Sequence, residues 1–144
     1  MIQRGALTGF LSGSIMGLAM KVLEAISSKK VYVLLLNVDF IPYIGSRDLL
    51  ELAEFSLHVL MAILLGIIFA WLMERNADSK NSPYFWSFLL TLPTVFLYFP
   101  LTILAIKDTP AVDDPISFSL WTVGHILFAI LLPIFYSPRQ KQRG

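Results

Sequence analysis

The stretch FSLHVLMAILLGIIFAWLM, from Phe55 to Met73, decides the fold of this chain. It carries no Asp, Glu, Lys or Arg, and nearly all of its side chains are apolar. A helix rises about 1.5 Å per residue and needs roughly 20 apolar residues to cross a hydrocarbon core about 30 Å thick. The stretch has this length and composition, so it predicts a membrane-spanning helix.

Three other stretches meet the same criterion, namely Gly5 to Ile26, Tyr84 to Ile106 and Ile116 to Tyr136. The whole chain is 56% hydrophobic and only 15% charged, whereas a soluble domain has about 25% charged residues. We therefore predict an all-α fold, a polytopic bundle of four transmembrane helices that forms a single domain over residues 1–144. Five aromatic residues near the span ends are expected at the membrane–water interface: Trp71, Tyr84, Trp86, Trp121 and Tyr136.

The segment between the first two spans contains a shorter apolar run, Val31 to Leu36. It is too short to cross a bilayer, so we expect an interfacial or re-entrant segment after the first helix. A fifth, distorted span is the alternative. In the third span, Pro93 and Pro100 are spaced to kink the helix.

The basic residues that flank the spans predict the orientation. Six of them lie in the N-terminus, the second loop and the C-terminus, and four lie on the opposite side, with Lys21 near the end of the first span. We therefore expect a multi-pass protein of the cell membrane, of bacterial type, with both termini in the cytoplasm. The two groups are Arg4, Arg75, Lys80, Arg139, Lys141 and Arg143 against Lys29, Lys30, Arg47 and Lys107.

The second and fourth spans share a local sequence. His58 to Phe69 aligns without gaps to His125 to Tyr136, with seven of twelve positions identical, and these are the two histidines of the chain. One interpretation is a tandem duplication of a two-helix hairpin, which would make the second and fourth spans parallel. The other is chance similarity between apolar helices.

Four glycines recur at steps of four in the first span: Gly5, Gly9, Gly13 and Gly17. Glycine at this spacing lets two helix backbones approach closely in lipid. We expect a packing face within the bundle, with a homo-oligomer interface as the alternative.

Ionisable side chains within or beside the spans form two candidate polar relays. Lys21 and Glu24 lie three residues apart on one helix face and are expected to pair. Glu51, Glu54 and His58 lie on one face of the second span and lead inward. Ionisable residues inside a membrane are costly and often functional.

The histidines leave three interpretations open. His58 and His125 are hydrogen-bonded packing residues, or part of a proton or ion path with the two glutamates, or the axial ligands of a b-type haem. In each case the rings should point into the bundle, because an unpartnered imidazole N–H facing lipid costs roughly 2 kcal/mol or more. The expected partners are each other or the hydroxyls of Ser12, Ser56, Thr91, Thr94, Thr102 and Ser119.

No motif of a hydrolase, a nucleotide-binding protein or a metalloprotease occurs. The chain has no cysteine, and its net charge of +1 gives no reason to expect nucleic acid. We therefore expect a non-enzymatic structural or accessory membrane protein with lipid as its surroundings, no metal and no identified substrate. The alternative is a transport or proton- or electron-transfer component built on the histidines.

Gly13-x-x-x-Gly17-x-x-x-Lys21-x-x-Glu24 in the first span, together with Gly124-His125 in the last, resembles the YagU-like group of small bacterial inner-membrane proteins. The resemblance implies a multi-pass membrane protein with a loose link to acid tolerance. It implies no catalytic residue.

Overall fold

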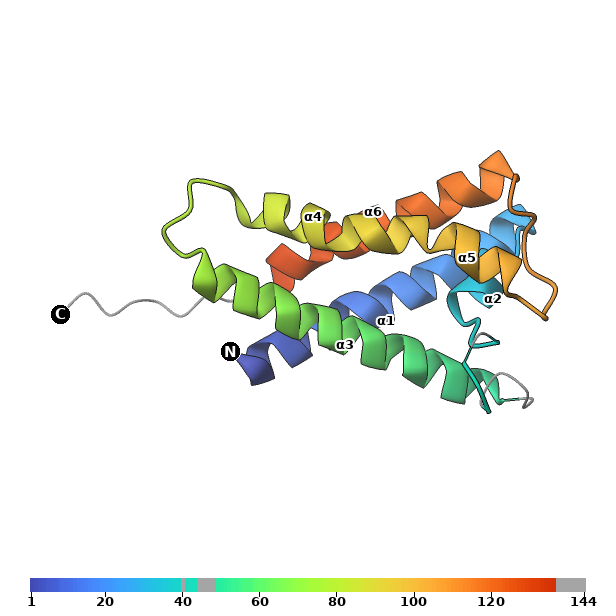
Figure 1. The fold of residues 1–144 in the computed structure, drawn as a ribbon, viewed down its shortest axis with the longest axis horizontal. Helices are drawn as coiled ribbons and strands as arrows, with labels where there is room; N and C mark the ends of the chain where they lie inside the picture. The colour runs from blue at the N-terminus through green and yellow to red at the C-terminus, as the bar shows by residue number, and fades with distance from the viewer. Residues whose placement is uncertain (40, 44–48, 137–144) are drawn as a thin grey trace.

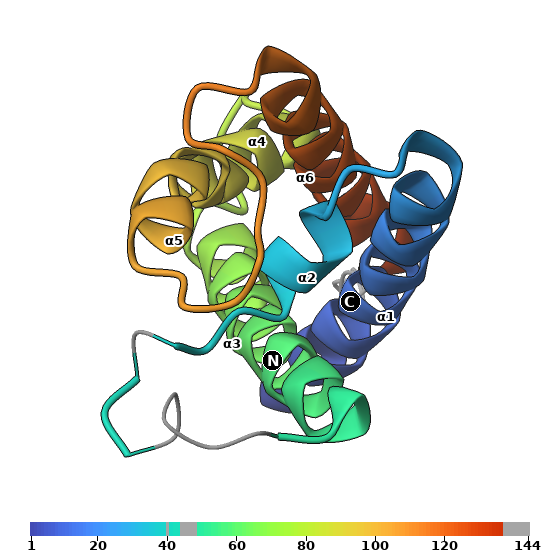
Figure 2. The ribbon, with the colours of Figure 1, turned by 90° about the vertical axis from the view of Figure 1, so that its right-hand side faces the viewer.

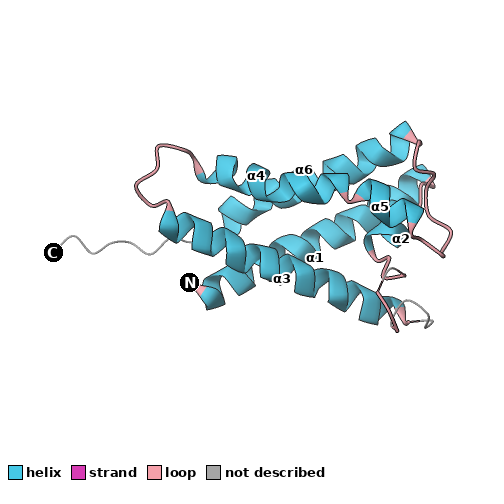
Figure 3. Ribbon diagram, viewed as in Figure 1, coloured by secondary structure: helices cyan, strands magenta, loops and turns pink. Residues whose placement is uncertain are grey.

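The computed structural model describes residues 1–39, 41–43 and 49–136 of the chain. This part contains helices joined by loops and no strand (Figure 3). The helices are α1 (Ile2–Ser27), α2 (Val31–Leu35), α3 (Glu51–Arg75), α4 (Pro83–Phe96), α5 (Tyr98–Ile103) and α6 (Pro115–Phe135). Of the residues that predict the orientation, Arg47 and those from Arg139 onward lie outside the described ranges.

Four rods form the bundle: α1, α3, α4 continued by α5, and α6 (Figure 1). α1 packs against α3 and α6, and α4 packs against α6 and, less closely, against α3. α3 and α6 therefore lie diagonally across the bundle (Figure 2), and they run in the same direction. We call the end at which α2 lies the α2 end, and the end at which α1 begins the terminal end. The predicted all-α four-helix bundle is confirmed.

The four rods have the length and composition of membrane spans. Ile2–Ser27, Glu51–Arg75, Pro83–Ile103 and Pro115–Phe135 each contain an apolar window long enough to cross a bilayer. Large apolar side chains cover their outward faces, for example Leu18 at 58% exposed. A water-soluble bundle would place polar groups there, so this is a multi-pass membrane protein.

The third span differs from its prediction, which was one helix from Tyr84 to Ile106. It is broken at Leu97 into α4 and α5, and it ends at Ile103. Pro100 lacks the N–H that would bond the carbonyl of Phe96, and its ring crowds that carbonyl, so the helix breaks there. The segment that follows is a loop.

Small residues set the close approach of α1 and α3. A Cβ atom added to Gly5 would lie 2.6 Å from the Cα of Ile67, and one added to Gly9 would lie 2.7 Å from the Cα of Ile63. Carbon atoms normally stay 3.5–4.0 Å apart. The two backbones can therefore touch only because the first span carries glycine at these positions.

The short helix α2 lies inside the α2 end of the bundle, against α1, α5 and α6 (Figure 2). Val31 and Leu34 are fully buried. The carboxylate of Glu24 accepts hydrogen bonds from the N–H groups of Tyr32 (2.8 Å) and Val33 (3.1 Å), which have no partner within the helix. The predicted interfacial segment is thus a helix that closes one end of the bundle.

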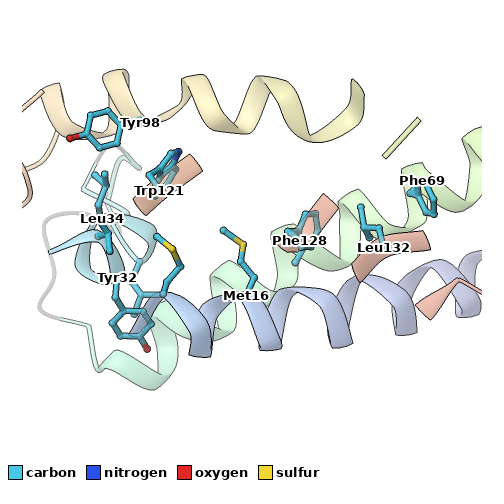
Figure 4. Packing of buried hydrophobic residues seen from close by; sticks show 12 residues of the cluster. Met16, Tyr32, Leu34, Phe69, Tyr98, Trp121, Phe128 and Leu132 are labelled. Atoms are coloured by element: carbon cyan, nitrogen blue, oxygen red, sulfur yellow. The ribbon is translucent and has the colours of Figure 1, made fainter. Parts of the chain in front are cut away.

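Buried side chains form a row along the bundle axis (Figure 4). Tyr98 and Trp121 lie toward the α2 end, Met16 and Phe128 follow, and Phe69 lies toward the terminal end. Trp121 is only 2% exposed, so its predicted place at the membrane interface is wrong. Its indole N–H donates to the carbonyls of residues 94 and 95 at the end of α4, at 3.3 and 3.0 Å.

Candidate functional site: a cavity beside the break between α4 and α5

A cavity of about 320 Å³ lies in the half of the bundle nearer the α2 end. All four rods contribute to its wall, and the chain that follows α2 closes it toward the α2 end. Its surface is mainly apolar, with side chains such as Met16, Leu65 and Phe128. Six side chains with polar atoms share this wall: Asn37, Glu54, His58, Thr94, Trp121 and His125. Binding sites for small molecules combine apolar walls with a few placed polar groups in this way.

The cavity opens toward the outside of the bundle between α3 and the break in the third span. Leu60 and Met61 on α3 line it and are 50% and 60% exposed, and Leu97 at the break lines it and is 47% exposed. These side chains belong to apolar spans, so the opening faces lipid and not water. The proline-induced break and the loose packing of α3 on α4 together leave this gap.

His125 is buried on α6, at 6% exposed, and its ring packs against that of Trp121 at a tilt of 39°, with ring centroids 4.4 Å apart. Its Nδ1 lies 2.8 Å from the carbonyl oxygen of Trp121, one turn earlier in the same helix. Because a carbonyl only accepts, Nδ1 carries the hydrogen. In the neutral ring Nε2 is then a hydrogen-bond acceptor, and no partner for it is found among the described residues.

His58 is half-buried on α3 and lines the same cavity as His125 on α6. Its Nε2 is 3.1 Å from the carbonyl oxygen of Gly13 on α1. Nε2 therefore carries the hydrogen, and Nδ1 is the acceptor of the neutral ring. Both histidine rings face the bundle interior as expected, but the expected hydroxyl partners are wrong. Backbone carbonyls accept these hydrogen bonds instead. The carbonyl of Gly13 reaches His58 because the α1 backbone lies close to α3, and the carbonyl of Trp121 reaches His125 because it lies one helical turn earlier.

The glutamates separate into different roles. Glu54 is 7% exposed, lines the cavity and pairs with Lys107 from the loop after α5. Glu51 is exposed and bonds Lys21 (2.6 Å) and the hydroxyl of Tyr32 (2.9 Å) instead. Glu51 therefore lies apart from Glu54 and His58, with which it was predicted to form a relay. The predicted pair of Lys21 with Glu24 is also wrong, because the carboxylate of Glu24 caps α2.

The loops at the α2 end are tied to the cavity by polar contacts. Asn37 donates from Nδ2 to the carbonyl of Leu101 (3.0 Å). Asp39 accepts from the N–H groups of Ile106 (2.7 Å) and Lys107 (2.9 Å), so the chain after α5 is held against the chain after α2. These contacts fix the position of Lys107, which pairs with Glu54 at the cavity wall.

A second group of ion pairs holds the helix ends together outside the cavity. Lys29 bonds Asp114 at 2.7 Å, and Lys30 pairs with Asp108. The Lys29 ammonium and the hydroxyl of Ser117 hold the pKa of Asp114 at about 2. Burial and the hydrogen bond to Glu51 raise the pKa of Tyr32 well above its usual range. This end of the bundle is therefore closed by charge pairs.

The glycine stripe does not belong to the cavity. Gly5, Gly9 and Gly13 face α3, and Gly17 faces the ring of Phe55 on the same helix. The stripe is thus covered within one chain, and an oligomer formed through the first helix would need another of its faces. Oligomerisation through this helix stays a prediction.

The positions of the ring nitrogens do not decide the haem hypothesis. A haem between the rings needs one free nitrogen on each histidine, and each ring keeps one, Nδ1 of His58 and Nε2 of His125. The haem hypothesis stays a prediction. In the part of the chain that the structure describes, no three His, Asp or Glu side chains come together as metal ligands do.

Two features of the site were missed in the sequence. Ala62, Gly66 and Ala70 recur at steps of four on the second span, and they form the small-residue face that receives the glycines of α1. Their spacing is a signal that could have been found. The pairing of Lys107 with Glu54 joins residues 53 positions apart, and nothing in the local sequence indicates it.

Comparisons of this chain with protein-family models, with curated proteins and with solved structures give no match. The resemblance to the YagU-like group therefore stays a prediction, and function is argued from the cavity.

Proposed function

We propose that this protein is a non-enzymatic membrane protein that takes a lipophilic molecule from the bilayer and holds it in the cavity. We further propose that it resides in the cell membrane of a bacterium with both termini in the cytoplasm. The cavity then lies in the outer half of the bilayer. The observation that carries the proposal is the cavity of about 320 Å³, with apolar walls and buried histidine, open toward the lipid-facing surface.

The position of the opening favours a lipophilic ligand over a water-soluble one. A ligand from water would have to pass the α2 end, where α2 and its ion pairs lie. A ligand from lipid passes only between apolar side chains, Met61 on one side and Leu97 on the other. Moving between two apolar surroundings carries little desolvation cost.

The proposal accounts for polar side chains that packing alone does not require. A bundle held together only by contact would fill its interior with apolar side chains at crystal-like density. Here the interior keeps a cavity, and two ionisable side chains with little exposure, Glu54 and His125, line it. Such residues within spans are costly and mark functional paths.

The test uses Trp121 as a reporter inside the cavity wall. In a background with Trp71→Phe and Trp86→Phe, the fluorescence of Trp121 is titrated with 1-bromo-4-hexylbenzene in detergent micelles. We expect saturable quenching, because bromine in the cavity would contact the indole.

A matched pair of variants provides the control. Leu65→Phe fills the cavity, whereas the neighbouring Leu64→Phe adds the same bulk on the lipid-facing side, where Leu64 is 47% exposed. Saturable quenching should persist in Leu64→Phe and disappear in Leu65→Phe. Quenching that rises in proportion to the probe in all three proteins would show partition into the micelle only, and the proposal would be wrong.

A further inference from the structure

The hydrogen-bond donors and acceptors of the cavity wall differ in whether they already have partners, and this difference points to the chemistry of the ligand. Each donor group on the wall already makes a hydrogen bond. Asn37 donates to Leu101, the hydroxyl of Thr94 donates to the carbonyl of Thr91 (2.6 Å), and the indole of Trp121 donates to Val95.

The acceptors are not all engaged. Nε2 of His125 and Nδ1 of His58 have no hydrogen-bond partner among the described residues, because the opposite nitrogen of each ring makes the bond to a carbonyl. The side chain of His125 is more than nine-tenths buried and lines the cavity, so its free acceptor is open to a group that enters the cavity.

We propose that the ligand of this cavity is a lipophilic alcohol or phenol whose hydroxyl donates to the free ring nitrogen of His125. The inference rests on the proposed function and adds the chemical class of the ligand. The hydroxyl hydrogen meets the unpartnered acceptor, and the apolar part lies along Met16, Leu65 and Phe128. His58 offers a second acceptor on the opposite wall.

The charged groups of the wall agree with an uncharged ligand. The carboxylate of Glu54 lies on the wall, and it is paired with the ammonium of Lys107. An anionic ligand would have to compete with that carboxylate, and a cationic ligand would have to displace Lys107 from it. An uncharged hydroxyl leaves the pair intact, which avoids exposing one buried charge without its partner.

The proposal is tested with two competitors that differ in one hydrogen-bond donor, 4-hexylphenol and its methyl ether 4-hexylanisole. Each displaces 1-bromo-4-hexylbenzene from the single-tryptophan protein. We expect the phenol to displace the probe at about a tenfold lower concentration than the ether, as one added hydrogen bond implies. In His125→Phe, which keeps a ring on Trp121 and removes the acceptor, this ratio should fall toward one. Comparing this phenol-to-ether ratio between the protein with His125 and the His125→Phe variant cancels any unequal partition of the two compounds into micelles.

A second measurement needs no substitution at the histidine. In protein labelled with ¹⁵N-histidine, the resonance of Nε2 of His125 should move when 4-hexylphenol is added and stay in place with 4-hexylanisole. Equal displacement by both compounds, with no such movement, would overturn the alcohol or phenol inference and leave the lipophile-binding function intact. Failure of the brominated probe itself to bind would overturn the function.

Discussion

Replacing Gly9 with alanine tests whether backbone contact between α1 and α3 holds the bundle together. The added Cβ would meet the carbonyl of Ala62 and lie 2.7 Å from the Cα of Ile63. Both obstacles are backbone atoms of a helix, so neither can rotate away. To restore a normal carbon–carbon separation of about 3.5 Å, the helices must part by nearly 1 Å.

A gap of 0.5–1 Å forfeits a quarter to a half of each contact across the interface. Overpacking of this kind costs typically 1–3 kcal/mol. We expect Gly9→Ala to lower the free energy of unfolding by about 2 kcal/mol, measured by reversible denaturation in mixed micelles. The expected sign is opposite to the intrinsic effect of the change, because alanine in a helix is favoured over glycine by roughly 0.5–1 kcal/mol.

Gly124→Ala is the matched control. It is the same chemical change in the middle of α6, but the new Cβ meets Sδ and Cγ of Met20, which are side-chain atoms and not backbone atoms. The Met20 side chain is fully buried but flexible, and it can shift where a helix backbone cannot, so this variant should lose less stability than Gly9→Ala. Equal stability of Gly9→Ala and Gly124→Ala would refute the argument from backbone contact.

Three further predictions concern the charge pairs, the topology and the histidines. The pKa of Asp114 is lowered from 3.8 to about 2, so its carboxylate stabilises the fold above pH 4, and this contribution is lost as the pH falls toward 2. The difference in stability between wild type and Asp114→Asn, measured by thermal unfolding, should therefore shrink over that pH range. A constant difference would contradict the pairing with Lys29. A reporter active only in the cytoplasm and fused to Gly144 should be active, whereas a stably inserted but inactive fusion would reverse the proposed orientation. The purified protein should show no Soret absorbance, and a Soret band lost in His125→Phe would instead establish haem ligation.

The sequence predicts the bundle well because a membrane span is a local property. Its length and composition are read from about 20 neighbouring residues, and each of the four spans is found within a few residues of its predicted ends. The break at Leu97 is also local in origin, since Pro100 determines it. The sequence also predicts a kink in this span, but it predicts a helix as far as Ile106 because no charged residue interrupts the run before Lys107.

The site could be predicted only in part, because its contacts join distant parts of the chain. The histidines stand out as the ionisable residues in the middle of two spans, and their burial follows from the cost of an imidazole in lipid. Their partners do not follow, since a backbone carbonyl carries no signal in the side-chain sequence. The ion pair of Glu54 with Lys107 and the capping of α2 by Glu24 depend in the same way on how the loops fold back over the bundle.

The cavity follows from unequal packing on the two sides of α3. Toward α1, the helix presents Ala62 and Gly66, which let the backbones touch and leave no space. Toward the third span, it presents Leu57 and Met61 to a helix that proline breaks at the same level. Large side chains opposite a broken helix cannot interlock as ridges and grooves do, so a gap remains. Close packing of α1 with α3 thus fixes His58 at one wall of that gap, by bringing the carbonyl of residue 13 within 3.1 Å of its ring. The glycines of the first span, although they lie outside the cavity, therefore determine which nitrogen of His58 is left to accept a hydrogen bond from a ligand.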